Sequence, residues 1–224
     1  MNHDDIHALE SIDKLNFYNS YIFEKILKSV FFGKVLDFGC GFGTFIEYVK
    51  HNLNKEIIGY DINPKAIKEL EKKNINYLKS LENSDQSFDS IVSMNTLEHI
   101  KDDQLVLNQF NKILKKGGIL VLYLPQSMKV WTNLDHLVGH HRRYTKNDLH
   151  KKIKKSNFKI LSTEYVDSTG WLVLFLSKFF KIDLKYDEKR LLIYDKYIFR
   201  YFKYFDILFK NFFGKNILVV ARKL

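Results

Sequence analysis

A glycine-rich segment at residues 35–43 constrains this 224-residue chain more than any other feature. It reads VLDFGCGFG and lies where a short predicted strand at 34–38 gives way to helical periodicity at 43–52. Glycines between a strand and a helix let a ligand approach the backbone amides at the helix N-terminus. The segment therefore predicts an α/β fold with a ligand at its first strand–helix junction.

Strand and helix patterns alternate along the rest of the chain. Repeated units of this length favour right-handed crossovers and a largely parallel, buried sheet. We predict a single domain over 1–224, with an N-terminal helix in 1–32, a ligand-binding core at 33–166, a helical insertion at 167–215 and a final strand in 216–224. The predicted strands are 34–38, 56–61, 75–79, 88–94, 119–124, 158–166 and 216–222, and the predicted helices are 11–32, 43–52, 64–73, 101–114 and 145–155.

Two carboxylates accompany the glycine-rich segment. Asp37 stands two residues before Gly39, in a G-x-G-x-G loop and not in the G-x-G-x-x-G pattern of dinucleotide sites. Its charge would repel a pyrophosphate, but it suits a ligand with an amino group and a positive sulfonium. Asp61 ends the next strand, 18 residues after Gly43, where it could accept hydrogen bonds from both ribose hydroxyls or cap the following helix.

Four segments, VLDFGCGFG, IIGYDINP, FDSIVSMNTLEHI and LKKGGILVLYLP, resemble in order and spacing the class I S-adenosylmethionine-dependent methyltransferases. The resemblance covers about residues 30–165. It implies a Rossmann-like seven-stranded sheet of order 3-2-1-4-5-7-6, flanked by helices and with the last strand antiparallel. It also implies S-adenosylmethionine as cofactor and S-adenosylhomocysteine as product. The implied cofactor-binding residues are Asp37, Gly39, Cys40, Gly41, Gly43, Asp61, Ile62, Ser80, Leu81 and Asn95.

The segment after the fifth predicted strand is rich in side chains that could act on a methyl acceptor. Residues 136–143 contain three of the eight histidines and two of the five arginines. Guanidinium groups beside imidazoles suit a phosphate or a carboxylate. The alternative is that Arg143 and Tyr144 only anchor this loop to the sheet edge. We predict His140, His141, His136 or His99 as the base, and Arg142, Arg143, Tyr144 and Gln126 as acceptor-binding residues.

The same histidines also offer candidate metal ligands. His136 and His140 have helical spacing, and Glu98-His99 resembles part of the E-x-x-E-H metal pattern of some O-methyltransferases. The first acid of that pattern is Asn95 here. We therefore predict no metal.

The stretch between residues 166 and 216 is too long for an unstructured connection in a compact domain. Residues 171–215 hold 15 aromatic side chains and ten cations against five acids. We expect the 171–213 insertion to cover the acceptor site as a lid, with a homodimer interface or a peripheral membrane contact as alternatives. The polar side chains predicted to form one helical stripe are Lys196, Arg200, Lys203, Asp206 and Lys210.

Composition narrows the remaining classes. The formal net charge is +10, but only five of the 36 cations are arginine. The excess therefore indicates the lysine-rich codon usage of an AT-rich genome more than a surface that binds nucleic acid. The single cysteine excludes an intramolecular disulfide and favours a reducing compartment. With neither a leader-like N-terminus nor an apolar run near 20 residues, we expect a cytoplasmic protein.

Together these features predict methyl transfer from S-adenosylmethionine to oxygen of a small anionic acceptor, phosphorylated or carboxylated, such as a surface-polysaccharide or glycoconjugate precursor. A nucleic-acid methyltransferase and a non-catalytic methyltransferase-like binding subunit are the alternatives. No Asn/Asp-Pro-Pro-aromatic tetrapeptide follows the fourth strand, so we expect no nucleic-acid partner. The intact glycines, Asp37 and Asp61 argue against a non-catalytic subunit.

Overall fold

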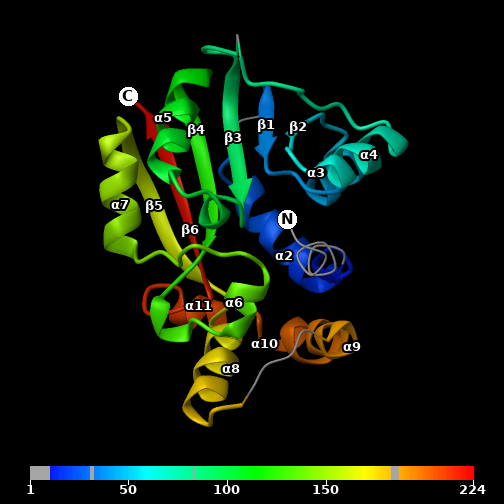
Figure 1. Cartoon of the computed structure of the whole chain (residues 1–224), viewed down its shortest axis with the longest axis vertical. Coiled ribbons are helices and arrows are strands. Elements are labelled where there is room, and N and C mark those ends of the chain that lie inside the picture. The colour runs from blue at the N-terminus through cyan, green and yellow to red at the C-terminus, as the bar shows by residue number, and fades with distance from the viewer. Residues whose placement is uncertain (1–10, 31–32, 83, 183–186) are drawn as a thin grey trace.

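The computed structural model describes residues 11–30, 33–82, 84–182 and 187–224. Its strands form one mixed sheet of order β2-β1-β3-β4-β6-β5, with helices on both faces (Figure 1). β6 runs antiparallel to both of its neighbours, and the other pairs are parallel. The strands are β1 (Val35–Phe38), β2 (Ile58–Tyr60), β3 (Phe88–Met94), β4 (Leu114–Pro125), β5 (Phe158–Val166) and β6 (Asn216–Lys223).

The predicted strand at 75–79 does not form, so the prediction of seven strands is wrong. Tyr77 makes a single parallel bridge to Gly59, and no longer ladder follows. β2 offers only three residues for pairing, and Asn74 turns the chain with a positive φ of 52° just before the bridge. This edge of the sheet therefore ends in one bridge and not in a strand.

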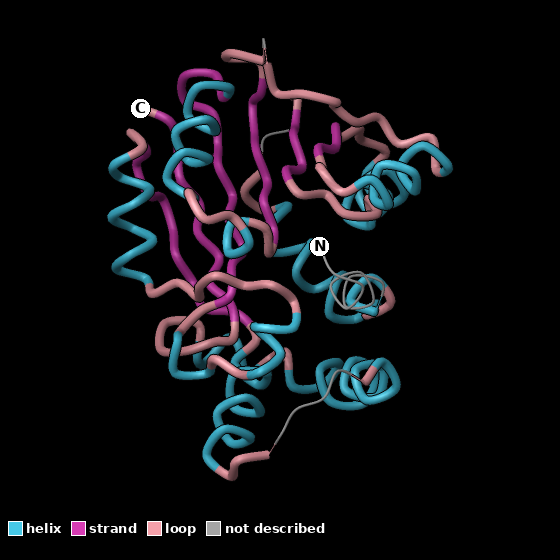
Figure 2. The backbone as a smooth tube through the Cα atoms, in the orientation of Figure 1, coloured by secondary structure: helices cyan, strands magenta, loops and turns pink. Residues whose placement is uncertain are grey.

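The helices and short helical turns fill the connections between strands (Figure 2). Residues 1–10 and 31–32 of the predicted N-terminal helix lie outside the described residues, and α2 covers a shorter range than predicted. The helices are α2 (Asn16–Leu27), α3 (Thr44–Leu53), α4 (Pro64–Lys72), α5 (Asp103–Ile113), α6 (Asn133–Leu137), α7 (Lys146–Lys155), α8 (Ser168–Phe179), α9 (Glu188–Ile193), α10 (Arg200–Phe202) and α11 (Phe205–Phe209), with 3₁₀ turns η1 (Leu97–His99) and η2 (Met128–Val130) and a π-helical turn η3 (Tyr194–Phe199).

The central strand β4 divides the core into two layers. Successive side chains of a strand point to opposite faces: Val121 and Tyr123 pack with α2 and α3, whereas Leu120 and Leu122 pack with α5 and α7. Both faces of β4 are buried from Ile119 onward. This double burial explains why β4 reads as a continuous apolar run and not as an alternating one.

Two predicted helix starts are confirmed by their caps. The Asn63 side chain accepts a hydrogen bond from the Lys65 backbone N–H at 3.0 Å, ahead of Pro64 in the first turn. The Thr145 hydroxyl accepts from the Asp148 backbone N–H at 3.2 Å. Each cap satisfies a backbone donor that the helix itself cannot satisfy.

The described residues between β5 and β6, 168–182 and 187–215, are here called the helical segment and form α8, α9, η3, α10 and α11. The predicted single polar stripe is wrong, because several short elements replace one helix and Asp206 points inward. Asp206 is 2% exposed and accepts from the backbone N–H groups of Asp167 (2.8 Å) and Ser168 (2.7 Å). Stripe spacing on an assumed straight helix could not reveal this capping role. No helix in the described part of the chain has the length and apolarity needed to span a bilayer.

Candidate active site

The glycine-rich loop leaves the carboxyl end of β1 and is held against the end of β2. Gly39, Gly41 and Gly43 have positive φ angles of 76°, 53° and 79°. A Cβ at Gly39 would collide with the side chain of Thr96. The Gly39 N–H donates to the Tyr60 carbonyl at 2.8 Å. Glycine is thus required here for both backbone conformation and close approach.

Asp37 is a buried carboxylate without a partner. It is 1% exposed, and neither of its carboxylate oxygens has a hydrogen-bond partner. Burial first, and then the nearby charge of Asp61, raise the pKa of Asp37 to about 8. A buried polar group in this state is costly. The site is therefore suited to a ligand that brings positive charge or N–H donors.

Asp61 follows β2 and faces the same loop. Its Oδ2 accepts from the Gly41 backbone N–H at 2.9 Å, and its Oδ1 accepts from the Asn63 backbone N–H at 2.8 Å. The capping alternative raised from the sequence is therefore partly realised, because Asp61 orders the turn into α4. Both oxygens retain lone pairs for a ligand hydroxyl.

Asn95 marks the carboxyl end of β3. Its φ is 44°, its backbone N–H donates to the Tyr123 carbonyl at 2.8 Å, and its Oδ1 accepts from the Asn216 side chain at 3.0 Å. These bonds connect the ends of β3, β4 and β6 at one edge of the sheet. Asn216 was not named from the sequence, where it appears only as the first residue of a strand.

The other residues predicted around the cofactor have mixed settings. Ile62 is 81% exposed directly beside Asp61, whereas Leu81 is buried in the core. Ser80 is exposed, and its hydroxyl accepts from the Glu82 backbone N–H at 3.1 Å. Burial first, and then the charge of Asp37, raise the pKa of the Cys40 thiol, so Cys40 is not a ready thiolate nucleophile. Their contacts with a cofactor stay predictions.

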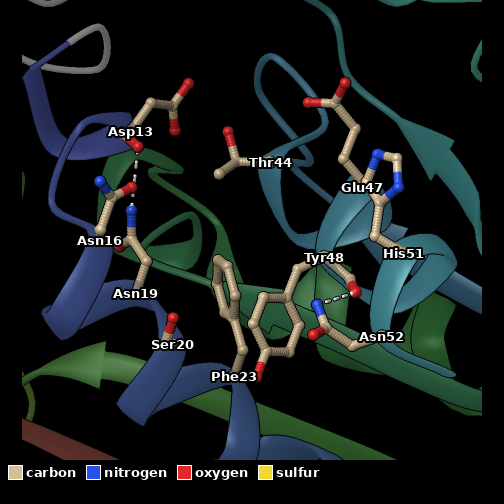
Figure 3. Close-up of a pocket in the computed structure, with 10 residues that line it drawn as sticks. All are labelled: Asp13, Asn16, Asn19, Ser20, Phe23, Thr44, Glu47, Tyr48, His51 and Asn52. Atoms are coloured by element: carbon tan, nitrogen blue, oxygen red, sulfur yellow. Dashed lines mark hydrogen bonds between the residues drawn. The ribbon is translucent and has the colours of Figure 1, made fainter.

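A cleft of about 250 Å³ lies between α2 and α3, next to the glycine-rich loop (Figure 3). Thr44, the residue after Gly43, lines one side, and Phe23 and Tyr48 form an aromatic wall. Asn19 borders the cleft from α2. None of these lining residues stands out in the sequence as a site residue, because the pairing of α2 with α3 is a tertiary contact.

The two segments that follow β3 and β4 meet, as their placement after neighbouring strands predicted. The His141 backbone N–H donates to the Glu98 carbonyl at 2.8 Å, which holds the loop after β4 against η1. The rings of His99 and His140 lie edge to face, with centroids 4.8 Å apart. His141 itself is exposed, and the exposed His136 accepts from the Trp131 indole N–H at 2.9 Å.

His140 contacts Asp135 and lies near Glu98. Its Nδ1 lies 2.8 Å from Oδ1 of Asp135, and its Nε2 lies 3.8 Å from Oε1 of Glu98. Burial alone would raise the pKa of Asp135, but hydrogen bonds from His140 and Arg143 lower it to about 2. Burial raises the pKa of Glu98 to about 8. Asp135 is thus ionised at neutral pH, whereas burial favours the protonated form of Glu98.

Both arginines are paired with carboxylates of the protein. Arg143 Nε donates to Asp135 Oδ1 at 2.7 Å, and Arg142 Nη1 lies 2.8 Å from Asp103 Oδ2. Tyr144 is 2% exposed and donates its hydroxyl to Asp103 at 2.8 Å. These contacts favour the anchoring alternative. Because Tyr144 is buried, it is poorly placed to contact a methyl acceptor. Binding of the methyl acceptor by the two arginines stays a prediction.

Gln126 begins the loop after β4. It forms a parallel bridge to Tyr144, and its carbonyl accepts from Arg143 Nη1 at 3.4 Å. Its side-chain Oε1 is buried without a hydrogen-bond partner. Contact between Gln126 and a methyl acceptor therefore stays a prediction. A hydrogen-bond donor on the methyl acceptor would satisfy this oxygen.

The comparison with protein families agrees with this geometry. A family model described as a methyltransferase domain matches residues 11–163, which is more than half of the chain. The chain belongs to the class I S-adenosylmethionine-dependent methyltransferases. The match contains the glycine-rich loop, Asp61, Asn95 and the loop after β4.

Relatives of this methyltransferase have diverse names. An uncharacterized protein of Methanocaldococcus jannaschii is 32% identical over 179 residues, 75% of this chain and 73% of that protein. A mitochondrial ubiquinone biosynthesis O-methyltransferase of Dictyostelium discoideum is 26% identical over 131 residues, 49% of this chain and 41% of the relative. Phosphoethanolamine N-methyltransferase 3 of Arabidopsis thaliana is 31% identical over 99 residues, 40% of this chain and 20% of the relative.

A solved structure shares the fold. The S-adenosylmethionine-dependent methyltransferase of Archaeoglobus fulgidus superposes with a TM-score of 0.62 at 23% identity, over 94% of each chain. S-adenosylmethionine is the cofactor of this family, and the residues present fit it. The orphaned Asp37 carboxylate suits the ligand's ammonium and sulfonium charges, and Asp61 suits its ribose hydroxyls.

Three side chains of the methyltransferase could together hold a metal ion. Glu98, His99 and His140 each offer one ligand atom, and these atoms all lie within 4.8 Å of one another. The departure at Asn95 from the metal pattern still stands. The prediction that no metal is bound therefore stays a prediction.

Proposed function

We propose that this methyltransferase transfers the methyl group of S-adenosylmethionine to an oxygen of a small acceptor that carries a phosphate or a carboxylate. His140 is the base in this proposal. The observation that carries it is the contact between His140 Nδ1 and the ionised Asp135 at 2.8 Å, in the loop that packs on η1 after β3.

Methyl transfer from a sulfonium is an in-line displacement with a neutral leaving group, so the protein mainly aligns the two reactants and excludes water. A hydroxyl acceptor must also lose a proton. When Asp135 accepts the Nδ1–H of neutral His140, the lone pair of Nε2 is available to take that proton. The Arg143–Asp135 pair at 2.7 Å fixes the acid that orients the imidazole, so Arg143 is a positioning residue here.

Two relatives support the acceptor class. One is named an O-methyltransferase of ubiquinone biosynthesis, and another is named for phosphoethanolamine, a phosphorylated acceptor. Saccharide-linked phosphates and carboxylates belong to the same chemical class, so surface-polysaccharide or glycoconjugate precursors are included among the proposed acceptors. The Arg142 side chain is 25% exposed and pairs with Asp103. In this proposal it binds the anionic group of the acceptor while it keeps its contact with Asp103.

The test is a screen of phosphorylated and carboxylated hydroxyl compounds for formation of S-adenosylhomocysteine. We expect turnover with one such class, and a drop in kcat of about 10²-fold in His140→Gln with cofactor binding retained. His136→Gln is the matched control, because His136 is exposed and bonded to Trp131. Turnover only with nucleic acid, or cofactor binding with no turnover on any acceptor, would overturn the proposal.

A further inference from the structure

The helical segment concentrates the exposed apolar side chains of the protein. Among the described residues, 25 large hydrophobic side chains are exposed, and 17 of them lie between residues 172 and 212. Phe179, Phe180 and Phe212 are 70%, 65% and 73% exposed. An apolar surface of this extent marks an interaction site more often than a solvated face.

The inner side of the segment is already in use. Phe199 is fully buried and packs on the rings of Tyr18 and Tyr21 of α2. Asp195 accepts from the backbone N–H groups of Phe17 (3.1 Å) and Tyr18 (2.7 Å), at the start of α2. The exposed apolar side chains are therefore not the face that joins the segment to the rest of the protein.

Charge on the outer side is mostly positive. Asp195 and Asp206 are buried as helix caps. Asp187 and Glu188 are half-buried and pair with Arg190 (3.4 Å) and Lys14 (2.8 Å). Their side chains are 41% and 43% exposed, and each is paired with a cation. The exposed cations are Lys178, Lys181, Lys189, Arg190, Lys196, Arg200 and Lys210.

Tyrosines and cations alternate on this surface. The Lys196 Nζ lies 5.0 Å from the ring centroid of Tyr197. The Arg200 guanidinium lies 5.7 Å from that of Tyr201 and 4.9 Å from that of Phe17 in α2. Both tyrosines are about 60% exposed. Aromatic rings with a polar tip and long cationic side chains with apolar stems suit a boundary between water and hydrocarbon.

We propose that the helical segment docks the protein onto the surface of a membrane that contains anionic lipids. The apolar side chains enter the headgroup region, and the cations meet lipid phosphates. A symmetric contact with a second copy would bring this cationic surface against an identical cationic surface, so charge favours lipid over a dimer. In Figure 1 α8 and α11 lie at the edge toward which β3 points, so docking would bring the membrane near the carboxyl ends of the strands.

The experiment is co-sedimentation with vesicles of phosphatidylcholine alone and with about 30% phosphatidylglycerol. We expect binding to the anionic vesicles that falls as salt rises from about 0.05 M to about 0.5 M. The double variant Lys178→Glu/Lys210→Glu should bind at least about tenfold more weakly, since each lysine near the surface contributes about fivefold. Lys55→Glu/Lys116→Glu is the matched control, because both lysines are exposed and lie in other parts of the fold.

A second pair of variants tests the apolar contact. Phe179→Ser/Phe180→Ser should lose vesicle binding, whereas Leu53→Ser/Leu105→Ser, also exposed, should retain it. Thermal unfolding of each variant confirms that the fold is intact. Absence of binding to anionic vesicles at low salt would overturn the proposal. So would equal losses in test and control variants, or a dimer in sedimentation equilibrium that Phe179→Ser/Phe180→Ser dissociates.

Discussion

The carboxylates of Asp37 and Asp61 approach one glycine-rich loop from adjacent strands, yet only Asp61 has hydrogen-bond partners. Asp61 accepts from the backbone N–H groups of Gly41 and Asn63, whereas both oxygens of Asp37 are buried and unpaired. The charge of Asp61 also raises the pKa of Asp37, after burial itself. Without a cationic ligand, the site therefore contains two neighbouring acids of which one, Asp37, has no compensating charge or hydrogen-bond donor.

Cofactor affinity should therefore depend on pH through Asp37. Its pKa is about 8 without ligand, and the positive cofactor lowers that pKa, so binding below pH 8 releases a proton. We expect the Kd to fall about tenfold per pH unit between pH 6 and 8 and then to level off. Calorimetry in buffers of different ionisation enthalpy counts the proton. The Asp37→Asn variant should bind the cofactor weakly, and its Kd should not show this dependence on pH between about 6 and 8. An unchanged pH dependence of the Kd in Asp37→Asn would contradict the prediction.

The same group should reduce stability of the cofactor-free protein at neutral pH. Below pH 3.8 Asp37 is protonated both folded and unfolded, so its contribution is zero. Between 3.8 and about 8 the unfolded state loses the proton while the folded state keeps it, so stability falls as pH rises. Asp37→Asn should gain on the order of a few kcal/mol over the wild type at pH 8 and little at pH 4, measured by urea unfolding. A gain independent of pH would refute this account.

Asp195 should contribute to stability as the cap of α2 from a distant part of the chain. Asp195→Ala removes the acceptor of the Phe17 and Tyr18 backbone N–H groups, and we expect a loss of about 2 kcal/mol in the free energy of unfolding. Asp187→Ala is the matched control, because Asp187 caps only the short α9. Equal losses in the two variants would show that the contact with α2 is not the reason.

The two arginines should separate into structural and acceptor roles. Arg143→Ala leaves the buried Asp135 without its ion pair, so we expect a loss of about 3 kcal/mol. Arg142→Ala should cost less, because Asp103 keeps Lys152 at 2.7 Å. KM for the acceptor, measured below the unfolding temperature, decides the other role. If the double variant Arg142→Ala/Arg143→Ala binds cofactor normally and its acceptor kinetics are unchanged, the hypothesis that these arginines bind an anionic acceptor is wrong.

Metal removal should leave activity unchanged. In the proposed mechanism the Nε2 of His140 takes a proton, and a metal ion bound to Glu98, His99 and His140 would occupy that atom. We expect full activity after dialysis against a chelator and no stoichiometric metal in the purified protein. Loss of activity that zinc or another divalent ion restores would instead assign a metal site to these three residues.

The sequence alone predicted the elements whose causes are local. The Asn63-Pro64 and Thr145 caps start helices through hydrogen bonds two or three residues away, and the glycines with Asp37 and Asp61 identified the cofactor class. The predicted third strand failed because strand formation at a sheet edge depends on the partner, and β2 is only three residues long.

Only the tertiary structure decided what the charged side chains of the acceptor loop and the helical segment contact. Arg143 and Asp135 are eight residues apart, but the choice between an acceptor and an internal carboxylate depends on the folded loop. Asp195 and Asp206 look like members of a solvated surface in the sequence, yet they cap helices 177 and 38 residues away. The physical reason is that a buried carboxylate must find donors wherever the fold places them, and residue spacing does not encode that distance.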